Sequence, residues 1–143
     1  MTFNKQDKEY MKQAFELAIL GKGKVEPNPM VGAVLVNNRE VIGKGHHSSF
    51  GGLHAEIEAI NSCKNKDLLK NAVLYVTLEP CCHYGKTPPC TDAIIKAGIK
   101  RVVIAVQDPN PLVRGKGIET LRKSGIKVDT GCLQEQAKKI IVG

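Results

Sequence analysis

Aromatic residues are scarce in this chain of 143 residues, which has no tryptophan and an aromatic content of only 4%. Its core therefore has to be built from Val, Ile, Leu and Ala. The chain also lacks an apolar run near the roughly 18 residues that a membrane-spanning helix needs. Residues 1–9 are polar and carry charges of both signs, unlike the basic and then apolar layout of a secretory signal. We therefore expect no membrane partner and a cytoplasmic location.

Blocks of like charge are missing as well, although the formal net charge is +7. The lysines are spread along the chain and do not alternate with aromatic residues, as they do in many nucleic-acid-binding surfaces. The positive charge fits a solvated surface, and it would also attract a phosphorylated small molecule. We expect no nucleic-acid partner. No Gly-x-Gly-x-x-Gly motif follows a predicted strand, so we expect no NADP either.

Cysteine is present in an odd number, five, and three of the five lie between residues 81 and 90. In a chain that we place in the cytoplasm, such crowding favours a metal site over disulfide bonds. Cys63 and Cys132 lie outside this group. We expect both to be buried structural thiols, because a free buried cysteine behaves as a small apolar residue.

Hydrophobic periodicity divides the chain into ten elements. It predicts helices over residues 4–20, 55–63, 91–97, 118–123 and 133–142, and strands over residues 30–36, 40–45, 72–78, 101–106 and 126–129. The first two strands form an antiparallel hairpin through Asn37 and Asn38, and the later strand–helix alternation implies parallel pairing through crossover helices. The sequence predicts one α/β domain over residues 1–143, a three-layer αβα sandwich. Its five-stranded mixed sheet carries helices on both faces.

Residues of the types that bind metals lie where the predicted elements begin and end. His54 and Glu56 stand at a helix start, Cys81 follows the buried strand over residues 72–78, and Cys90 directly precedes a helix. Sites in parallel sheets gather at the carboxyl ends of strands, and a helix N-terminus favours a thiolate. His54, Cys81 and Cys90 supply the three protein ligands of a catalytic zinc site, with Glu56 free to transfer protons. The alternative is an exposed His54 with Glu56 favoured by the helix dipole.

These residues alone do not determine which residue is the third zinc ligand. Zinc deaminases commonly carry Pro-Cys-x-x-Cys, but the residue three positions after Cys81 is Tyr84. Either Cys90 closes the site across an insertion, or Cys82 or His83 replaces it. We favour Cys90, because adjacent residues such as Cys81 and Cys82 seldom reach one tetrahedral ion together.

Several motifs between residues 8 and 130 are shared with one known family. They are Pro27-Asn28-Pro29-Met30-Val31-Gly32, His54-Ala55-Glu56, Thr77-Leu78-Glu79-Pro80-Cys81, Thr87-Pro88-Pro89-Cys90, Ala97-Gly98-Ile99, Asp108-Pro109-Asn110-Pro111 and Gly115-Lys116-Gly117. Through them the chain resembles the diaminohydroxyphosphoribosylaminopyrimidine deaminases of the riboflavin pathway. The insertion that ends at Cys90 separates these proteins from the tRNA adenosine and cytosine deaminases.

The resemblance implies a cytidine-deaminase-like fold with one zinc ion per chain. It also implies hydrolytic deamination of 2,5-diamino-6-(5-phosphoribosylamino)pyrimidin-4(3H)-one to 5-amino-6-(5-phosphoribosylamino)uracil and ammonia, with Glu56 as the catalytic residue. Many members continue into an NADPH-dependent reductase domain, which residues 1–143 do not contain. The reductase would then be separately encoded or absent. We expect a homo-oligomer, as in many single-domain deaminases, or an association with a separate reductase.

Five further residues are candidates for binding the phosphorylated pyrimidine: Asn28, His47, His83, Lys86 and Asn110. Asn28 lies between two prolines and offers both a donor and an acceptor to a pyrimidine edge. Lys86 is a mobile point charge suited to phosphate. His47 and His83 could bond the ring, the ribose or the phosphate, and Asn110 lies in a rigid loop beyond a buried strand. Each also has an ordinary alternative as a turn residue, a solvated lysine or a structural histidine.

Two other functions stay open at this point. The chain could be a different zinc deaminase, acting on tRNA adenosine or on a guanine or cytosine nucleotide. The net charge slightly favours this, whereas the insertion with Lys86 argues against it. The chain could also be a structural zinc domain that binds nucleic acid. Such sites are usually closed by four protein ligands, and Cys82 or His83 would then supply the fourth.

Overall fold

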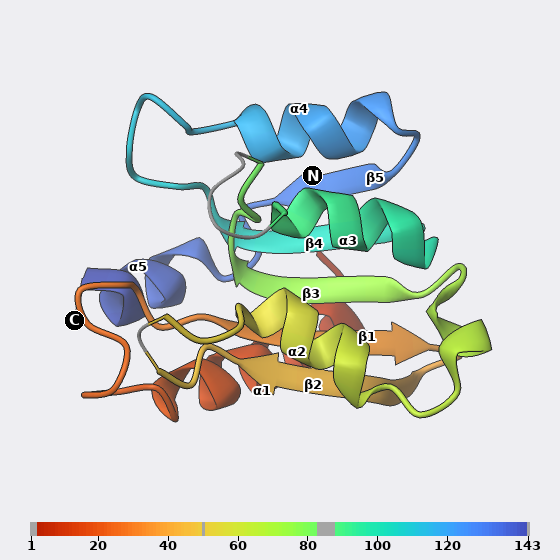
Figure 1. Cartoon of the computed structure of the whole chain (residues 1–143), viewed down its shortest axis with the longest axis horizontal. Coiled ribbons are helices and arrows are strands. Elements are labelled where there is room, and N and C mark those ends of the chain that lie inside the picture. Colours follow the sequence, from red (N-terminus) through yellow and green to blue (C-terminus); the bar gives the residue numbers. More distant parts are fainter. Residues whose placement is uncertain (1–2, 50, 83–87, 143) are drawn as a thin grey trace.

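A five-stranded mixed sheet forms the centre of the computed structural model, which describes residues 3–49, 51–82 and 88–142 (Figure 1). Its strands are β1 (Gly32–Asn37), β2 (Glu40–His46), β3 (Val73–Leu78), β4 (Arg101–Val106) and β5 (Lys127–Thr130). They lie side by side in the order β2-β1-β3-β4-β5. Strand β1 is antiparallel to β2 and β3, whereas β3, β4 and β5 are parallel. The predicted strand arrangement is confirmed.

Helices cover both faces of this sheet, as predicted. One face carries α1 (Lys5–Ile19) and α5 (Gln134–Val142). The other carries α2 (Ala55–Ser62), α3 (Cys90–Ala97) and α4 (Lys116–Lys123), and in Figure 1 α2 and α3 lie in front of the sheet. A short 3₁₀ helix, η1 (Lys66–Leu69), was not predicted. Among the described residues, no helix has the length and apolar character needed to cross a bilayer.

Each helical layer has its own apolar core against the sheet. Neighbouring strand residues point to opposite faces, so Leu35 joins the core beneath α2, α3 and α4 while Val34 joins the core beneath α1 and α5. Cys63 lies in the first core and Cys132 in the second, with 1% and 0% of their surfaces exposed. The expectation that both are buried structural thiols is confirmed.

Local signals set the start of α1 and the hairpin turn. The Asn4 side chain accepts the backbone N–H of Asp7 at 2.7 Å, and the Asp7 carboxylate accepts the backbone N–H of Asn4, which together form a capping box. The turn between β1 and β2 is made by Asn38 and Arg39, whose φ angles are 51° and 65°. Positive φ at both central positions suits the common two-residue hairpin turn. The turn therefore lies one residue later than the predicted turn at Asn37 and Asn38.

Two glycines of β2 bring α2 directly onto the sheet. A Cβ atom at Gly45 would overlap the Ala55 carbonyl oxygen, and a Cβ atom at Gly43 would overlap the carbonyl oxygen of Ala59. Any larger residue would therefore push the helix outward. This close packing fixes the first turn of α2 at the edge of the sheet, where two of the candidate site residues lie.

Arg101, at the start of β4, ties α1 to the sheet. Its guanidinium lies 3.0 Å from the Asp7 carboxylate and 2.8 Å from that of Asp129, and the Tyr75 hydroxyl donates to Asp7 at 2.7 Å. Burial alone would raise the pKa of Asp7. The hydrogen bonds from Arg101 and Tyr75 and the charge of Arg101 outweigh burial, so the pKa of Asp7 lies below its ordinary value.

We expect Asp7→Asn to lower the free energy of unfolding at pH 7 by about 2 kcal/mol, the size of a lost hydrogen bond to a charged group. Because the folded-state pKa of Asp7 is depressed, its contribution is present at neutral pH. It is lost as the pH falls from about 5 through the lowered pKa. Urea unfolding at pH 7 and at pH 3 measures this: the variant should lose less stability on acidification than the parent. Glu135→Gln, at an exposed carboxylate, is the control, and a variant as stable as the parent at pH 7 would contradict the expectation.

Candidate active site

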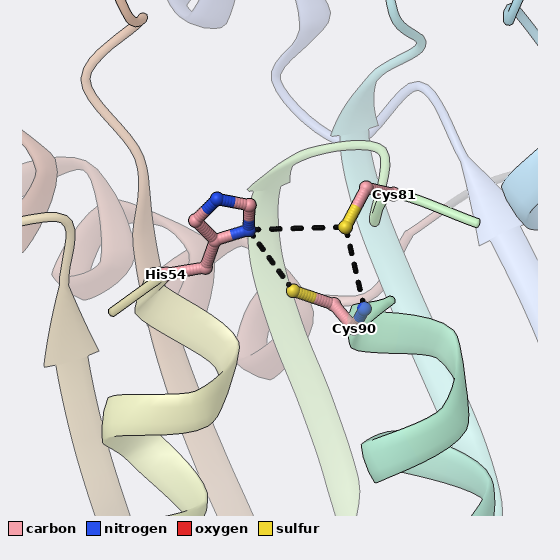
Figure 2. A group of neighbouring side chains, drawn as sticks. All are labelled: His54, Cys81 and Cys90. Atoms are coloured by element: carbon pink, nitrogen blue, oxygen red, sulfur yellow. Dashed lines mark hydrogen bonds between the residues drawn. The ribbon is translucent and has the colours of Figure 1, made fainter. Parts of the chain in front are cut away.

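Three potential metal ligands meet at the carboxyl end of β3 (Figure 2). The ligand atoms of His54, Cys81 and Cys90 all lie within 4.8 Å of one another. His54 Nδ1 is 3.2 Å from Cys90 Sγ and 3.8 Å from Cys81 Sγ, and the backbone N–H of Cys90 donates to Cys81 Sγ at 3.3 Å. The structure therefore groups the three residues favoured from the sequence. Cys82 is not part of this cluster, and His83 lies outside the described residues.

Each of the three residues is held by the end of a secondary-structure element. His54 is the N-cap of α2 and has extended backbone angles, φ −74° and ψ 158°. Cys81 follows the end of β3, and Cys90 is the first residue of α3. Because His54 is not itself helical, its side chain and that of Glu56 line the same cavity although they are only two residues apart. The carboxylate of Glu56 is buried, with 4% of the residue exposed.

The two thiols and Glu56 lie so close together that a negative charge on one of them disfavours ionisation of the others. A hydrogen bond from the Cys90 thiol, assisted by His54 and the Cys90 backbone N–H, outweighs burial and lowers the pKa of Cys81 to about 4. The same hydrogen bond and burial raise the pKa of Cys90, and burial raises the pKa of Glu56 to about 7. A cation bound among these groups would favour their ionised forms and let both thiols act as thiolates.

This donor set fits zinc. Imidazole nitrogen and thiolate sulfur are preferred zinc ligands, and three protein ligands with a fourth position for water are typical of catalytic sites. In the described part of the chain, no fourth His, Cys, Asp or Glu side chain joins the cluster. Within residues 3–49, 51–82 and 88–142, the cluster thus has the three protein ligands that are typical of a catalytic zinc site.

A cavity of about 350 Å³ opens beside the cluster. Its lining includes His54, Glu56 and Cys81 from the cluster side and Asn28 and Asp108 from other loops. Its size suits a small planar ring. Asp108 was not predicted to line a site, although its position just after β4, at the carboxyl end of a parallel strand, could have indicated it.

Asn28 and His47 form a hydrogen-bonded pair in this cavity. His47 is 4% exposed, its Nδ1 lies 3.0 Å from the Leu53 carbonyl oxygen and its Nε2 lies 3.1 Å from Asn28 Nδ2. A carbonyl oxygen can only accept, so Nδ1 carries the proton and Nε2 of the neutral ring accepts from Asn28. The pair therefore fixes the Asn28 amide and leaves its oxygen and one N–H for a ligand.

Other predicted substrate-binding residues stand apart from this pair. Asn110 is exposed, and its side-chain oxygen accepts the backbone N–H of Leu112 at 3.0 Å. It is not among the residues that line the cavity. His83 and Lys86 lie outside the described residues. Binding roles for all three stay predictions from the sequence.

Comparison with known proteins identifies the fold around this site. A family model described as the cytidine and deoxycytidylate deaminase zinc-binding region matches residues 4–106. The chain belongs to this family. The solved structure of RibD from Acinetobacter baumannii, in its second form, superposes with a TM-score of 0.93 at 47% identity, covering 97% of the deaminase chain and 39% of that protein. The predicted cytidine-deaminase-like fold is confirmed.

Two curated relatives indicate which kind of deaminase the chain is similar to. It is 57% identical over 92% of its length to the riboflavin biosynthesis protein RibD of Bacillus amyloliquefaciens, but it spans only 35% of that relative. It is 48% identical over 94% of its length to the diaminohydroxyphosphoribosylamino-pyrimidine deaminase of Buchnera aphidicola, of which it spans 90%. These matches confirm the resemblance stated from the motifs.

We expect Cys90→Ser to lower bound zinc from one ion per chain to well below that, because serine is a poor zinc ligand. Metal analysis after dialysis against a mild chelator measures the content. Cys82→Ser is the matched control, since Cys82 neighbours Cys81 but lies outside the cluster, and it should keep its zinc. The reverse result, with zinc lost from the Cys82 variant and kept in the Cys90 variant, would assign the third ligand to Cys82.

Proposed function

We propose that this deaminase converts 2,5-diamino-6-(5-phosphoribosylamino)pyrimidin-4(3H)-one and water into 5-amino-6-(5-phosphoribosylamino)uracil and ammonia. One observation carries the proposal. The cluster of His54, Cys81 and Cys90 shares its cavity with a buried carboxylate, Glu56, and with a fixed amide, Asn28. The 48% identity to a relative that is named for this deaminase activity, of which the chain spans 90%, supports the choice of substrate.

In this proposal His54, Cys81 and Cys90 hold one zinc ion. The ion, when bound, supplies a Lewis acid that lowers the pKa of a water molecule towards neutrality. Glu56 takes a proton from the attacking water and delivers protons to a ring nitrogen and to the departing amine. The C2–N bond breaks, a C2 carbonyl forms, and nitrogen leaves as ammonia. The burial of Glu56 keeps bulk water from competing for these protons.

Recognition of the pyrimidine begins with Asn28. Its amide oxygen and remaining N–H can pair with the donor and acceptor atoms on one ring edge, while His47 holds the amide in place. Lys86 and His83 are proposed to bind the phosphoribosyl group, and Asn110 to approach it from the loop after β4. The positive net charge of +7 would attract the phosphorylated substrate.

Partners and location complete the proposal. The deaminase matches only the deaminase portion of longer RibD relatives. We propose that it works as a homo-oligomer or with a separate reductase that consumes its product, in the cytoplasm, and that it does not bind NADP itself. A fluorescence titration with NADPH tests the last point.

We expect Glu56→Gln to keep zinc and to lower kcat by about 10³-fold, within the range for loss of a general acid–base residue. Ammonia release from the diaminopyrimidine substrate measures the rate, and metal analysis measures zinc. Glu58→Gln is the matched control, because Glu58 lies on the same helix and binds the Ser48 hydroxyl. A Glu56 variant with a near-normal rate would remove Glu56 from the mechanism.

The substrate is tested by comparing ammonia release from the phosphorylated pyrimidine, its dephosphorylated form and a tRNA anticodon stem-loop. We expect turnover of the first and none of the RNA. Lys86→Gln should raise KM for the phosphorylated pyrimidine about 10-fold, by loss of one charge-assisted contact, and leave KM for the dephosphorylated form unchanged. Preference for the stem-loop would replace the proposed function with tRNA deamination.

A further inference from the structure

We propose that Glu79 is a positioning residue that holds one wall of the substrate cavity, by fastening the loop of residues 108–117 to the end of β3. Glu79 directly follows β3, and only 6% of it is exposed. The kinetic part of this inference rests on the proposed function. Its structural part does not.

The carboxylate of Glu79 accepts four backbone N–H groups. Oε1 accepts from Asp108 at 3.1 Å and from Gly115 at 3.0 Å, and Oε2 accepts from Gly117 at 3.0 Å and from Ile118 at 3.4 Å. Among the described residues, no lysine or arginine forms an ion pair with it. The buried charge is therefore compensated by backbone amides and by the N-terminal end of α4.

Glu79 replaces a cap that α4 cannot supply from its own first residues. The N-cap of α4 is Gly115, which has φ 83° and no side chain to bind the free amides of the first turn. A carboxylate from another segment meets this need. Loop and strand also approach closely here, because a Cβ atom at Gly117 would overlap the Pro80 carbonyl oxygen.

The loop itself is held together by its own hydrogen bonds. Asn110 N–H donates to the Asp108 side chain at 2.9 Å, and Arg114 donates to the carbonyl oxygens of Asp108 and Pro109 at 3.2 and 3.1 Å. Such a loop shifts as a unit more easily than it deforms. In the described part of the chain, the hydrogen bonds between residues 108–117 and the segment after β3 all end on Glu79.

The position of this unit matters to the substrate because Asp108 lines the cavity beside Asn28. Glu79 lines the same cavity, but both of its carboxylate oxygens are held by backbone N–H groups of the loop and of α4. Asp108 and Pro109 also line an adjoining hollow, which shares Asn28 and Leu78 with the cavity and reaches Lys22 and Met30. A displaced loop would change the wall that faces the bound molecule. The metal ligands and Glu56, which lie on other segments, would stay in place.

Glu79→Gln tests this directly. Glutamine keeps the volume, but its NH₂ group faces backbone donors, so about half of the hydrogen bonds are lost together with the charge. We expect hydrogen exchange to accelerate at the amides of residues 108–118 and to stay unchanged in β3 and α2. We also expect KM to rise about 10-fold while kcat stays within about threefold, the pattern for lost binding without lost chemistry. Zinc content should not change.

Two variants complete the experiment. Glu79→Asp keeps the charge with a shorter reach and should restore part of the amide protection and part of the KM. If Glu79→Gln does not fold, the same measurements are made on Glu79→Asp. Glu119→Gln, at an exposed carboxylate of α4, is the control and should match the parent in exchange and KM.

Three results would overturn the inference. One is unchanged exchange at residues 108–118 in the Glu79 variants. Another is loss of zinc without a change in the loop, which would mean that Glu79 acts through Cys81. The third is accelerated exchange across the whole sheet, which would mark a general role in stability. A parent protein without deaminase activity would refute the proposed function, while the exchange and zinc measurements would still decide the role of Glu79.

Discussion

The burial of β3 between β1 and β4 is the constraint on which the site depends. Leu74 and Val76 are buried in the core beneath α2, α3 and α4, and Tyr75 is buried in the core beneath α1 and α5, so this strand cannot shift without disrupting both cores. Cys81 follows the carboxyl end of β3. Helices α2 and α3 begin at the same end of the sheet, with His54 and Cys90. The ligand atoms of these three residues therefore lie within 4.8 Å of one another.

Two buried carboxylates beside this edge have different surroundings and, in our proposals, different tasks. Glu56 lies against the sulfur atoms of the cluster, where burial raises its pKa. Glu79 is surrounded by four backbone N–H groups, which hold its charge and its geometry. A carboxylate with competing neighbours suits proton transfer, and one whose oxygens are fully bonded suits positioning.

Much of the fold could be predicted because its signals are local. The Asn4 cap, the apolar runs of β3 and β4 and the glycine after α3 each mark an element within a few residues of its observed bounds. The ion pairs of Arg101 could not be predicted, because Asp7 and Asp129 are distant in sequence and nothing local distinguishes them from surface carboxylates. For the same reason Glu79 was missed as a partner of α4, whereas Asp108, just after β4, could have been predicted from its place at the carboxyl end of a parallel strand.

Three features could be read from the amino-acid sequence alone: the residue types of the metal cluster, the buried strand that precedes Cys81, and the family to which the chain belongs. The cluster residues and the strand follow from spacing and local hydrophobicity, and the family follows from the shared motifs. All of these are present within single segments of the chain. The folded structure was needed to show that Cys90 and not Cys82 joins His54, and that Asp108 lines the cavity whereas Asn110 binds its own loop. These outcomes depend on contacts between segments that approach one another only when the sheet has formed.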